Sequence, residues 1–134
     1  MPADFFVDSN ICLYVLDKES LKFNKSKALL QLRPIISTQV IAENINVCLK
    51  KYKQTRAFAI AHANSLKEAC DVRGITAQTL NLALSIFEKY GYTIFDSLIL
   101  ASALDAGCRT VYTEDLQHGQ LINGNLKIVN PFIG

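Results

Sequence analysis

The sequence contains few of the residues on which common catalytic motifs depend. It has only two histidines, His62 and His118, and neither is followed by a metal-binding side chain three or four residues later. No two of the four cysteines form a C-x-x-C pair, and the chain has neither a glycine-rich phosphate loop nor a nucleophile elbow. These absences argue against a zinc site, P-loop nucleotide binding and serine hydrolase chemistry.

Long apolar segments are also missing. The apolar runs are short and interrupted, so no segment is expected to span a membrane. The start, Met1-Pro2-Ala3-Asp4, has no basic region and no cleavable apolar segment. A chain of 134 residues, half of them hydrophobic, suits one domain with its own core. We therefore expect a soluble, cytoplasmic protein with a single domain over residues 1–134.

The thiols and imidazoles have simple structural interpretations. The cysteines lie in apolar or helical stretches, which predicts buried thiols rather than disulfides. They are Cys12, Cys48, Cys70 and Cys108. His62 lies in an alanine-rich helical stretch and is expected to be structural. His118 follows Asp115 in a loop, where contact with a substrate remains an alternative.

Strands alternate with helices along the chain. Short strands are predicted at 4–7, 34–36, 109–112 and 126–129. Helices are predicted at 11–16, 20–32, from a cap at Ser37 or Thr38 to about Tyr52, at 55–72, at 76–90 before Gly91, and at 96–104. The segment 114–124 is predicted to be a polar loop. This alternation predicts an α/β domain with a mainly parallel sheet.

Four carboxylates are the candidate functional residues. Asp8 follows the apolar run Phe5-Phe6-Val7, and Asp115 follows the run 110–113. Glu43 and Asp96 lie near predicted helix starts. In open α/β sheets, ligands bind outside the carboxyl ends of the strands, so acids that return to that edge can meet in one pocket. A pocket of carboxylates without histidine or paired cysteines suits a hard divalent cation.

Each acid also has a plainer interpretation. An aspartate between a strand and a helix is a favoured N-cap, which contributes about 1 kcal/mol. This applies to Asp8, Asp96 and Asp115. Glu43 fits it less well, because it borders the apolar face of its helix one turn past the cap. It either reaches solvent at the flank or points into a shared polar pocket, where a cation would offset the cost of burial.

Several polar neighbours can support such a site. Glu114 adjoins Asp115 and can be an additional ligand or a group that lies just outside the ligands. Three hydroxyl or amide side chains can orient a carboxylate or a metal-bound water, or they can serve only in caps and turns. These are Ser9, Asn10 and Thr113. Asp105, in the last turn of its helix, is expected to be exposed.

The charge distribution adds an argument about partners. If four of the twelve acidic residues form a metal site, 14 basic residues remain against the other eight acidic ones. Such a surface attracts a polyanion once metal is bound. The densest basic stretch, Lys50 to Arg56, either contacts phosphates or is a solvated helix end.

Short motifs around the four acids resemble the PIN-domain ribonucleases, in particular the VapC-like toxins of type II toxin–antitoxin pairs. The matching segments, in the family's order, are Val7-Asp8-Ser9-Asn10, Ile36-Ser37-Thr38 with Glu43, Phe95-Asp96-Ser97 with Ala101 and Ala103, Thr113-Glu114-Asp115, and the closing Asn130-Pro131-Phe132. The resemblance spans nearly the whole chain. The chain departs from the pattern at Glu114, which precedes the Asp of the fourth motif.

The resemblance implies a three-layer α/β sandwich with a short, mainly parallel central sheet. It also implies Mg²⁺- or Mn²⁺-dependent cleavage of single-stranded RNA, an antitoxin partner and a homodimer. All four acids would then be catalytic and metal-binding. We expect Asp8 and Asp96 to bind metal directly, and Glu43 and Asp115 to bind a second ion or metal-bound waters.

Other functions fit the residues less well. A non-catalytic RNA- or partner-binding module on the same fold remains the main alternative. A phosphoacceptor domain requires paired acids after the first strand and a lysine after a late one. A haloacid-dehalogenase-like phosphatase requires a second Asp where this chain has Asn10.

Overall fold

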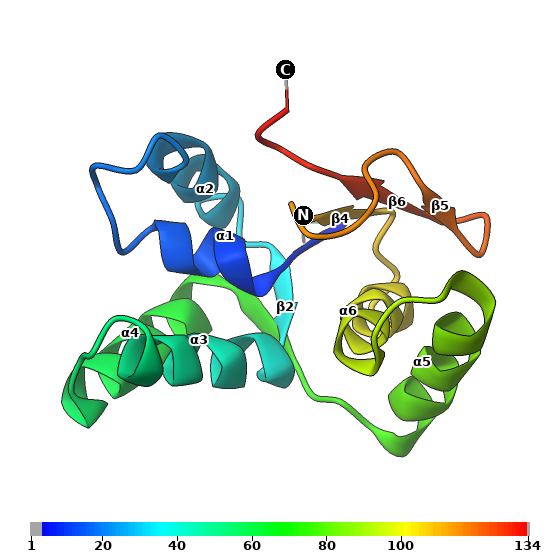
Figure 1. The fold of residues 1–134 in the computed structure, drawn as a ribbon, viewed down its shortest axis with the longest axis horizontal. Helices are drawn as coiled ribbons and strands as arrows, with labels where there is room; N and C mark the ends of the chain where they lie inside the picture. The colour runs from blue at the N-terminus through cyan, green and yellow to red at the C-terminus, as the bar shows by residue number, and fades with distance from the viewer. Residues whose placement is uncertain (1–3, 134) are drawn as a thin grey trace.

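A computed structural model describes residues 4–133, and its elements alternate along the chain (Figure 1). The strands of this part are β1 (Phe5–Val7), β2 (Ile35–Ser37), β3 (Asp71–Arg73), β4 (Thr110–Tyr112), β5 (Leu121–Ile122) and β6 (Leu126–Val129). The helices are α1 (Ser9–Tyr14), α2 (Phe23–Leu30), α3 (Thr38–Lys50), α4 (Arg56–Ala69), α5 (Ala77–Tyr90) and α6 (Ile94–Asp105). None of the helices described is long and apolar enough to cross a bilayer.

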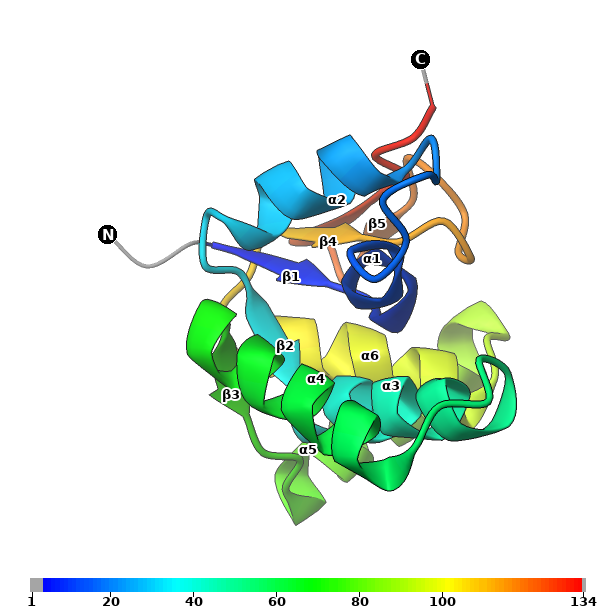
Figure 2. The ribbon, with the colours of Figure 1, turned by 90° about the vertical axis from the view of Figure 1, so that its left-hand side faces the viewer.

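The strands form one sheet in the order β3-β2-β1-β4-β6-β5. All neighbours are parallel except β5, which runs antiparallel to β6. Figure 2 shows α2 on one side of strands β1 and β4 and α3 to α6 on the other. This confirms the predicted α/β class with a mainly parallel central sheet between helical layers. β1 lies between β2 and β4, so its carboxyl end is at the middle of the sheet edge.

Burial of the central strands holds the layers together. Phe6, Ile36, Val111 and Ile128 are fully buried, one on each of four adjacent strands. Strands buried on both faces read as continuous apolar runs, which is why the sequence revealed them despite their shortness. As predicted, all four cysteines are buried and free.

The helix caps agree with the sequence at two positions and differ at two others. Ser37 caps α3, and its Oγ accepts a hydrogen bond from the Val40 N–H. Asp8 caps α1. Thr93, rather than Asp96, caps α6, so the helix begins two residues earlier than predicted. No helix follows Asp115 in the part of the chain described, so capping accounts for Asp8 alone among the three aspartates.

Two predicted elements were wrong because each includes residues that form an edge strand in the structure. The helix predicted at 55–72 ends at Ala69, and β3 follows at the edge of the sheet. The loop predicted at 114–124 contains β5 at the opposite edge. Strands of three and two residues are too short to show a period. β3 is defined by pairing with the distant β2, and β5 by a short hairpin with β6. The first two helices are also shorter or shifted, occupying 9–14 and 23–30.

Candidate active site

Asp8 is a buried carboxylate at the carboxyl end of β1, with only 6% of its surface exposed. Its Oδ1 accepts a hydrogen bond from the Ser9 N–H at 2.6 Å, and its Oδ2 accepts one from the Thr113 hydroxyl at 2.8 Å. Burial raises the pKa of Asp8 to about 6, and the charges of Glu43 and Asp115 also raise it. The two hydrogen bonds act in the opposite direction but do not restore an ordinary pKa.

The short helix α1 connects Asp8 to two more of the predicted acids. The Ser9 hydroxyl donates to Glu43 Oε1 on α3 at 2.6 Å. The Asn10 side-chain amide donates to Asp115 Oδ2 at 2.6 Å. The first turn of α1 therefore binds one carboxylate from each side of the β1 end. Ser9, Asn10 and Thr113 do orient carboxylates, as the sequence allowed.

Asp96 and Asp115 complete the group. Burial raises the pKa of Asp115, as do the charges of Glu114 and Asp96, while the Asn10 hydrogen bond lowers it. Asp96 lies in the first turn of α6, where its N–H donates to the Thr93 hydroxyl at 3.1 Å. Asp115 thus experiences the charge of Asp96, and Asp8 experiences those of Glu43 and Asp115. We call these four residues the acidic edge.

The acidic edge has the chemistry of a hydrated hard-metal site. Within residues 4–133, none of its acids forms an ion pair with a lysine or arginine. No three His, Cys, Asp or Glu side chains in that range gather closely enough to enclose a metal ion. Mg²⁺ needs no such enclosure, because it keeps several waters and takes one or two carboxylates directly. Oxygen donors around an uncompensated buried carboxylate fit such an ion.

Glu114 is bound by different residues. Its Oε2 is 2.5 Å from Lys22 Nζ, and its Oε1 accepts a hydrogen bond from the Tyr14 hydroxyl. Burial alone would raise the pKa of Glu114, but the hydrogen bonds from Lys22 and Tyr14 lower it. Neither Lys22 nor Tyr14 was recognised from the sequence, because nothing in the sequence pairs them with a residue about 100 positions away.

Two buried polar side chains, Asn44 and His62, hold the start of α1. Asn44 Nδ2 donates to the Ser9 carbonyl at 3.3 Å and to the Val40 carbonyl at 2.9 Å. Asn44 Oδ1 lies 2.9 Å from His62 Nε2. Both side chains are buried, and burial lowers the pKa of His62. His62 is therefore structural, as predicted, while Asn44 was missed, although an asparagine on the buried face of α3 was a visible signal.

Two residues that the sequence singled out have other contacts. His118 Nδ1 accepts a hydrogen bond from the Asn130 N–H at 2.9 Å, which stabilises the start of the C-terminal segment. Asp105 is exposed, as predicted, and its Oδ2 also accepts a hydrogen bond from the Thr79 hydroxyl at 2.6 Å.

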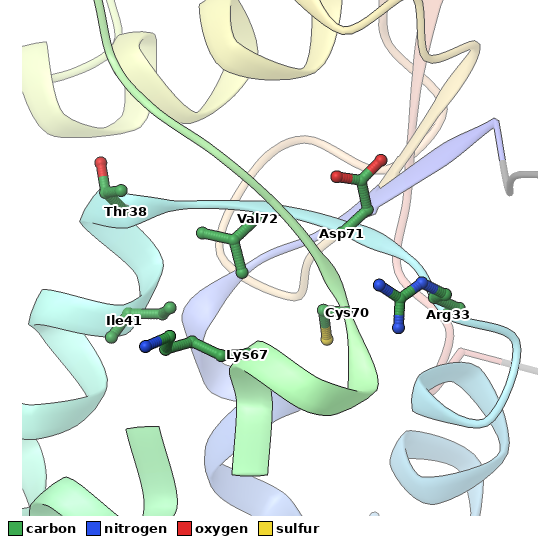
Figure 3. Close-up of a pocket in the computed structure, with 7 residues that line it drawn as sticks. All are labelled: Arg33, Thr38, Ile41, Lys67, Cys70, Asp71 and Val72. Carbon is green, nitrogen blue, oxygen red and sulfur yellow. The ribbon is translucent and has the colours of Figure 1, made fainter. Parts of the chain in front are cut away.

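A hollow of about 500 Å³ lies away from the acidic edge, between α3, the end of α4 and β3. We call it the β3 cavity. Its lining residues are Arg33, Thr38, Ile41, Lys67, Cys70, Asp71 and Val72. Figure 3 shows the Lys67 ammonium lying toward Ile41 and the Arg33 guanidinium on the side of Cys70 and Asp71. Burial raises the pKa of Cys70 to about 11, so this residue is an inert thiol and not a nucleophile.

The fold and the acidic edge together define an α/β protein with carboxylates at the carboxyl ends of parallel strands. The chain matches the family model of the PIN domain over residues 5–121, and it belongs to the PIN domain family. No curated protein has a significantly matching sequence.

Several solved structures share the fold. VapC20 of Mycobacterium tuberculosis, a toxin that cleaves the sarcin–ricin loop, matches with a TM-score of 0.67 and 22% identity, over 83% of this chain and 89% of that one. A toxin–antitoxin complex from Klebsiella pneumoniae matches with a TM-score of 0.69 and 21% identity, over 95% and 97%. DNA-bound VapBC from Salmonella typhimurium matches with 0.69 and 19%, over 96% and 98%. At these identities the likeness concerns the fold.

Proposed function

We propose that the chain is a metal-dependent endoribonuclease that hydrolyses phosphodiester bonds in single-stranded RNA, as the toxin of a toxin–antitoxin pair. The observation that carries this proposal is the acidic edge of a PIN domain, where the buried, uncompensated Asp8 lies within the electrostatic reach of Glu43 and Asp115. The toxins among the structures of similar fold support the biological role. We propose one nuclease domain over residues 1–134, of which 1–3 and 134 lie outside the described part.

In this mechanism, Asp8 and Asp96 would hold Mg²⁺ or Mn²⁺, and Glu43 and Asp115 would hold a second ion or its waters. The bound metal would activate a water and neutralise charge on the phosphate and the leaving oxygen. The chain's own residues supply orientation. The Ser9 N–H and the Thr113 hydroxyl fix the two oxygens of Asp8. The Ser9 hydroxyl occupies one oxygen of Glu43. The Asn10 amide occupies one oxygen of Asp115. The second oxygen of Glu43 or Asp115 can then accept a proton from the attacking water.

The basic stretch offers a surface for the RNA backbone. Lys50, Lys51, Lys53 and Arg56 are exposed at the end of α3 and the start of α4. Glu43 lies on the same helix, seven residues before Lys50, which corresponds to about 10 Å of helix rise. A phosphate chain that enters the acidic edge can therefore extend toward these cations. Such contacts fix the position of a nucleic acid without reading its sequence.

Cleavage of a labelled mixed RNA pool, with Mg²⁺, Mn²⁺ or a chelator, tests the proposal. We expect fragments only with metal, and none from the Asp96→Asn variant. Asp96 does not cap α6, so this substitution should leave the helix start intact. Glu88→Gln, at an exposed acid on α5, is the matched control and should cleave like the parent. RNA binding by the parent without any cleavage would instead favour the alternative, a non-catalytic RNA- or partner-binding module.

We also propose a homodimer and an antitoxin partner. The outer face of α5 supports the homodimer, because Leu80, Leu84 and Phe87 are 42%, 49% and 47% exposed at helical spacing. No charged residue occurs from 74 to 87, so two copies can meet there without like-charge repulsion. We expect Leu84→Glu to shift the protein from dimer to monomer in sedimentation, with Asn81→Glu on the same helix as the control. A monomeric parent would refute the homodimer. The antitoxin partner is tested separately, by co-purification of this chain with the product of a neighbouring gene.

A further inference from the structure

The fourth motif contains two adjacent acids, and the structure treats them differently. Asp115 receives the Asn10 amide at Oδ2, whereas both oxygens of Glu114 are already occupied by Lys22 and Tyr14. Glu114 is also the better shielded partner of its ion pair, with 16% side-chain exposure against 40% for Lys22. Both oxygens of Asp8 also accept hydrogen bonds, but only from neutral donors. Glu114 differs because the Lys22 ammonium offsets its charge, which weakens its attraction for a metal ion.

Aromatic rings hold Lys22 in place despite its partial exposure. Its Nζ lies 5.0 Å from the centroid of the Tyr14 ring and 5.3 Å from that of Phe132. These two rings pack edge to face, with centroids 5.6 Å apart. An ammonium near two aromatic faces is attracted by both ring quadrupoles. Lys22 is thus fixed by Glu114, Tyr14 and the C-terminal Phe132 together.

The two acids bind the same face of α1. Asn10 and Tyr14 are four residues apart, so their side chains lie one above the other on the helix. Asn10 binds Asp115 and Tyr14 binds Glu114, so the turn at 114–115 contacts α1 at two points. The Asp115 N–H also donates to the Thr113 hydroxyl, which itself donates to Asp8. A displacement of Glu114 would therefore be felt at Asp115 and, through Thr113, at Asp8.

We propose that Lys22 and Tyr14 are positioning residues for Asp115, and that Glu114 anchors this turn instead of binding metal. This inference rests on the proposed function only for the role of Asp115. Without Lys22, Glu114 would be a partly buried carboxylate beside the acidic edge, where its repulsion of Asp115 would loosen the Asn10 contact.

The first test uses metal-free protein and the NMR signals of the Asn10 side-chain amide. We expect Lys22→Met to speed solvent exchange of this amide at least several-fold, and Lys22→Arg to restore the parent rate. Lys25→Met, on an exposed lysine of α2, is the matched control and should leave the rate unchanged. A lower melting temperature for Lys22→Met with unchanged exchange at Asn10 would overturn the positioning role, because Lys22 would then only stabilise the fold.

The second test measures Mn²⁺ affinity by electron paramagnetic resonance. We expect Lys22→Met to weaken Mn²⁺ binding about tenfold, as is common when a residue that orients a ligand is lost. Asp115→Asn should weaken it at least as much, and Glu114→Gln by less than about threefold. An equal loss in Glu114→Gln and Asp115→Asn would make Glu114 a ligand and refute the inference. If the parent binds no Mn²⁺, the proposed function fails, and the Asn10 exchange still decides the positioning role.

Discussion

The acidic edge and the β3 cavity differ in what surrounds their charges. At the acidic edge, the oxygens of Asp8 accept only neutral donors, and no lysine or arginine within residues 4–133 pairs with it. In the β3 cavity, the one carboxylate, Asp71, is paired with Arg73 at 2.9 Å, which lowers its pKa. The lining of the cavity also contains Arg33 and Lys67, so its carboxylate lies among cations. The comparison teaches that a buried carboxylate without a cationic partner, rather than a hollow as such, distinguishes the candidate site.

The largest difference should appear in RNA cleavage. Asp8→Asn should lower the Mn²⁺-dependent rate by on the order of a thousandfold, as expected when a central electrostatic contact is lost. Asparagine still caps α1, so the fold should persist. Lys67→Met in the β3 cavity should leave the rate within about twofold of the parent. Single-turnover cleavage assays check both, and a larger loss in Lys67→Met than in Asp8→Asn would reverse the comparison.

The next difference concerns stability without metal. A carboxyl whose folded pKa is about 6, against an ordinary 3.8, destabilises the folded state increasingly as pH rises between these values. Asp8→Asn removes this cost, so it should stabilise the metal-free protein above pH 6 by up to about 3 kcal/mol. Below pH 4 the gain should disappear. Denaturant titrations of both proteins at pH 4 and 7 measure it, and a gain that is larger at pH 4 would contradict the assignment.

Bound metal should reverse the order of stability between the parent and Asp8→Asn. At a Mn²⁺ concentration 100 times its Kd, the parent should gain about 2.7 kcal/mol of unfolding free energy. Asp8→Asn should gain much less, while Lys67→Met should gain as much as the parent. Thermal unfolding with increasing Mn²⁺ distinguishes them. Equal stabilisation of all three proteins would place the ion elsewhere.

A smaller effect is expected beneath the acidic edge. Asn44→Leu removes the donor to the Ser9 carbonyl and leaves His62 Nε2 without its partner, which should cost about 2 kcal/mol. Thr38→Val, at an exposed residue of the β3 cavity, should change stability by no more than about 0.5 kcal/mol. Denaturant unfolding measures both. A neutral Asn44→Leu would show that this pair is not needed to hold α1.

The sequence predicted well those features that arise from local chemistry. The buried central strands, the Ser37 cap and the end of α5 at Gly91 each depend on a few neighbouring residues. Asp8 was recognisable because an apolar strand ends directly before it. Capping stayed open as the plainer interpretation of Asp96 and Asp115, because the sequence alone did not show that Thr93 starts α6 or that no helix follows β4 in the described chain.

Features that depend on long-range contacts could not be predicted. β3 is defined by its partner β2, which lies more than 30 residues earlier in the chain. The roles of Lys22 and Tyr14 depend on Glu114, which is 92 and 100 residues away. Asn44 is polar on a buried helix face, but its partners Ser9 and His62 come from two other segments. The catalytic and metal-binding roles of the four acids remain predictions.

The Thr113 hydroxyl has a consequence for biosynthesis. It donates to Asp8 across a separation of 105 residues, and Asn10 bridges an equal separation to Asp115. On the ribosome, the chain has made β1, α1 and Glu43 long before it makes β4, the central neighbour of β1. Until then, Asp8 lacks its Thr113 donor and Asp115 does not exist. The acidic edge therefore forms late, and a nascent chain stays incomplete there until Thr113 and Asp115 have emerged.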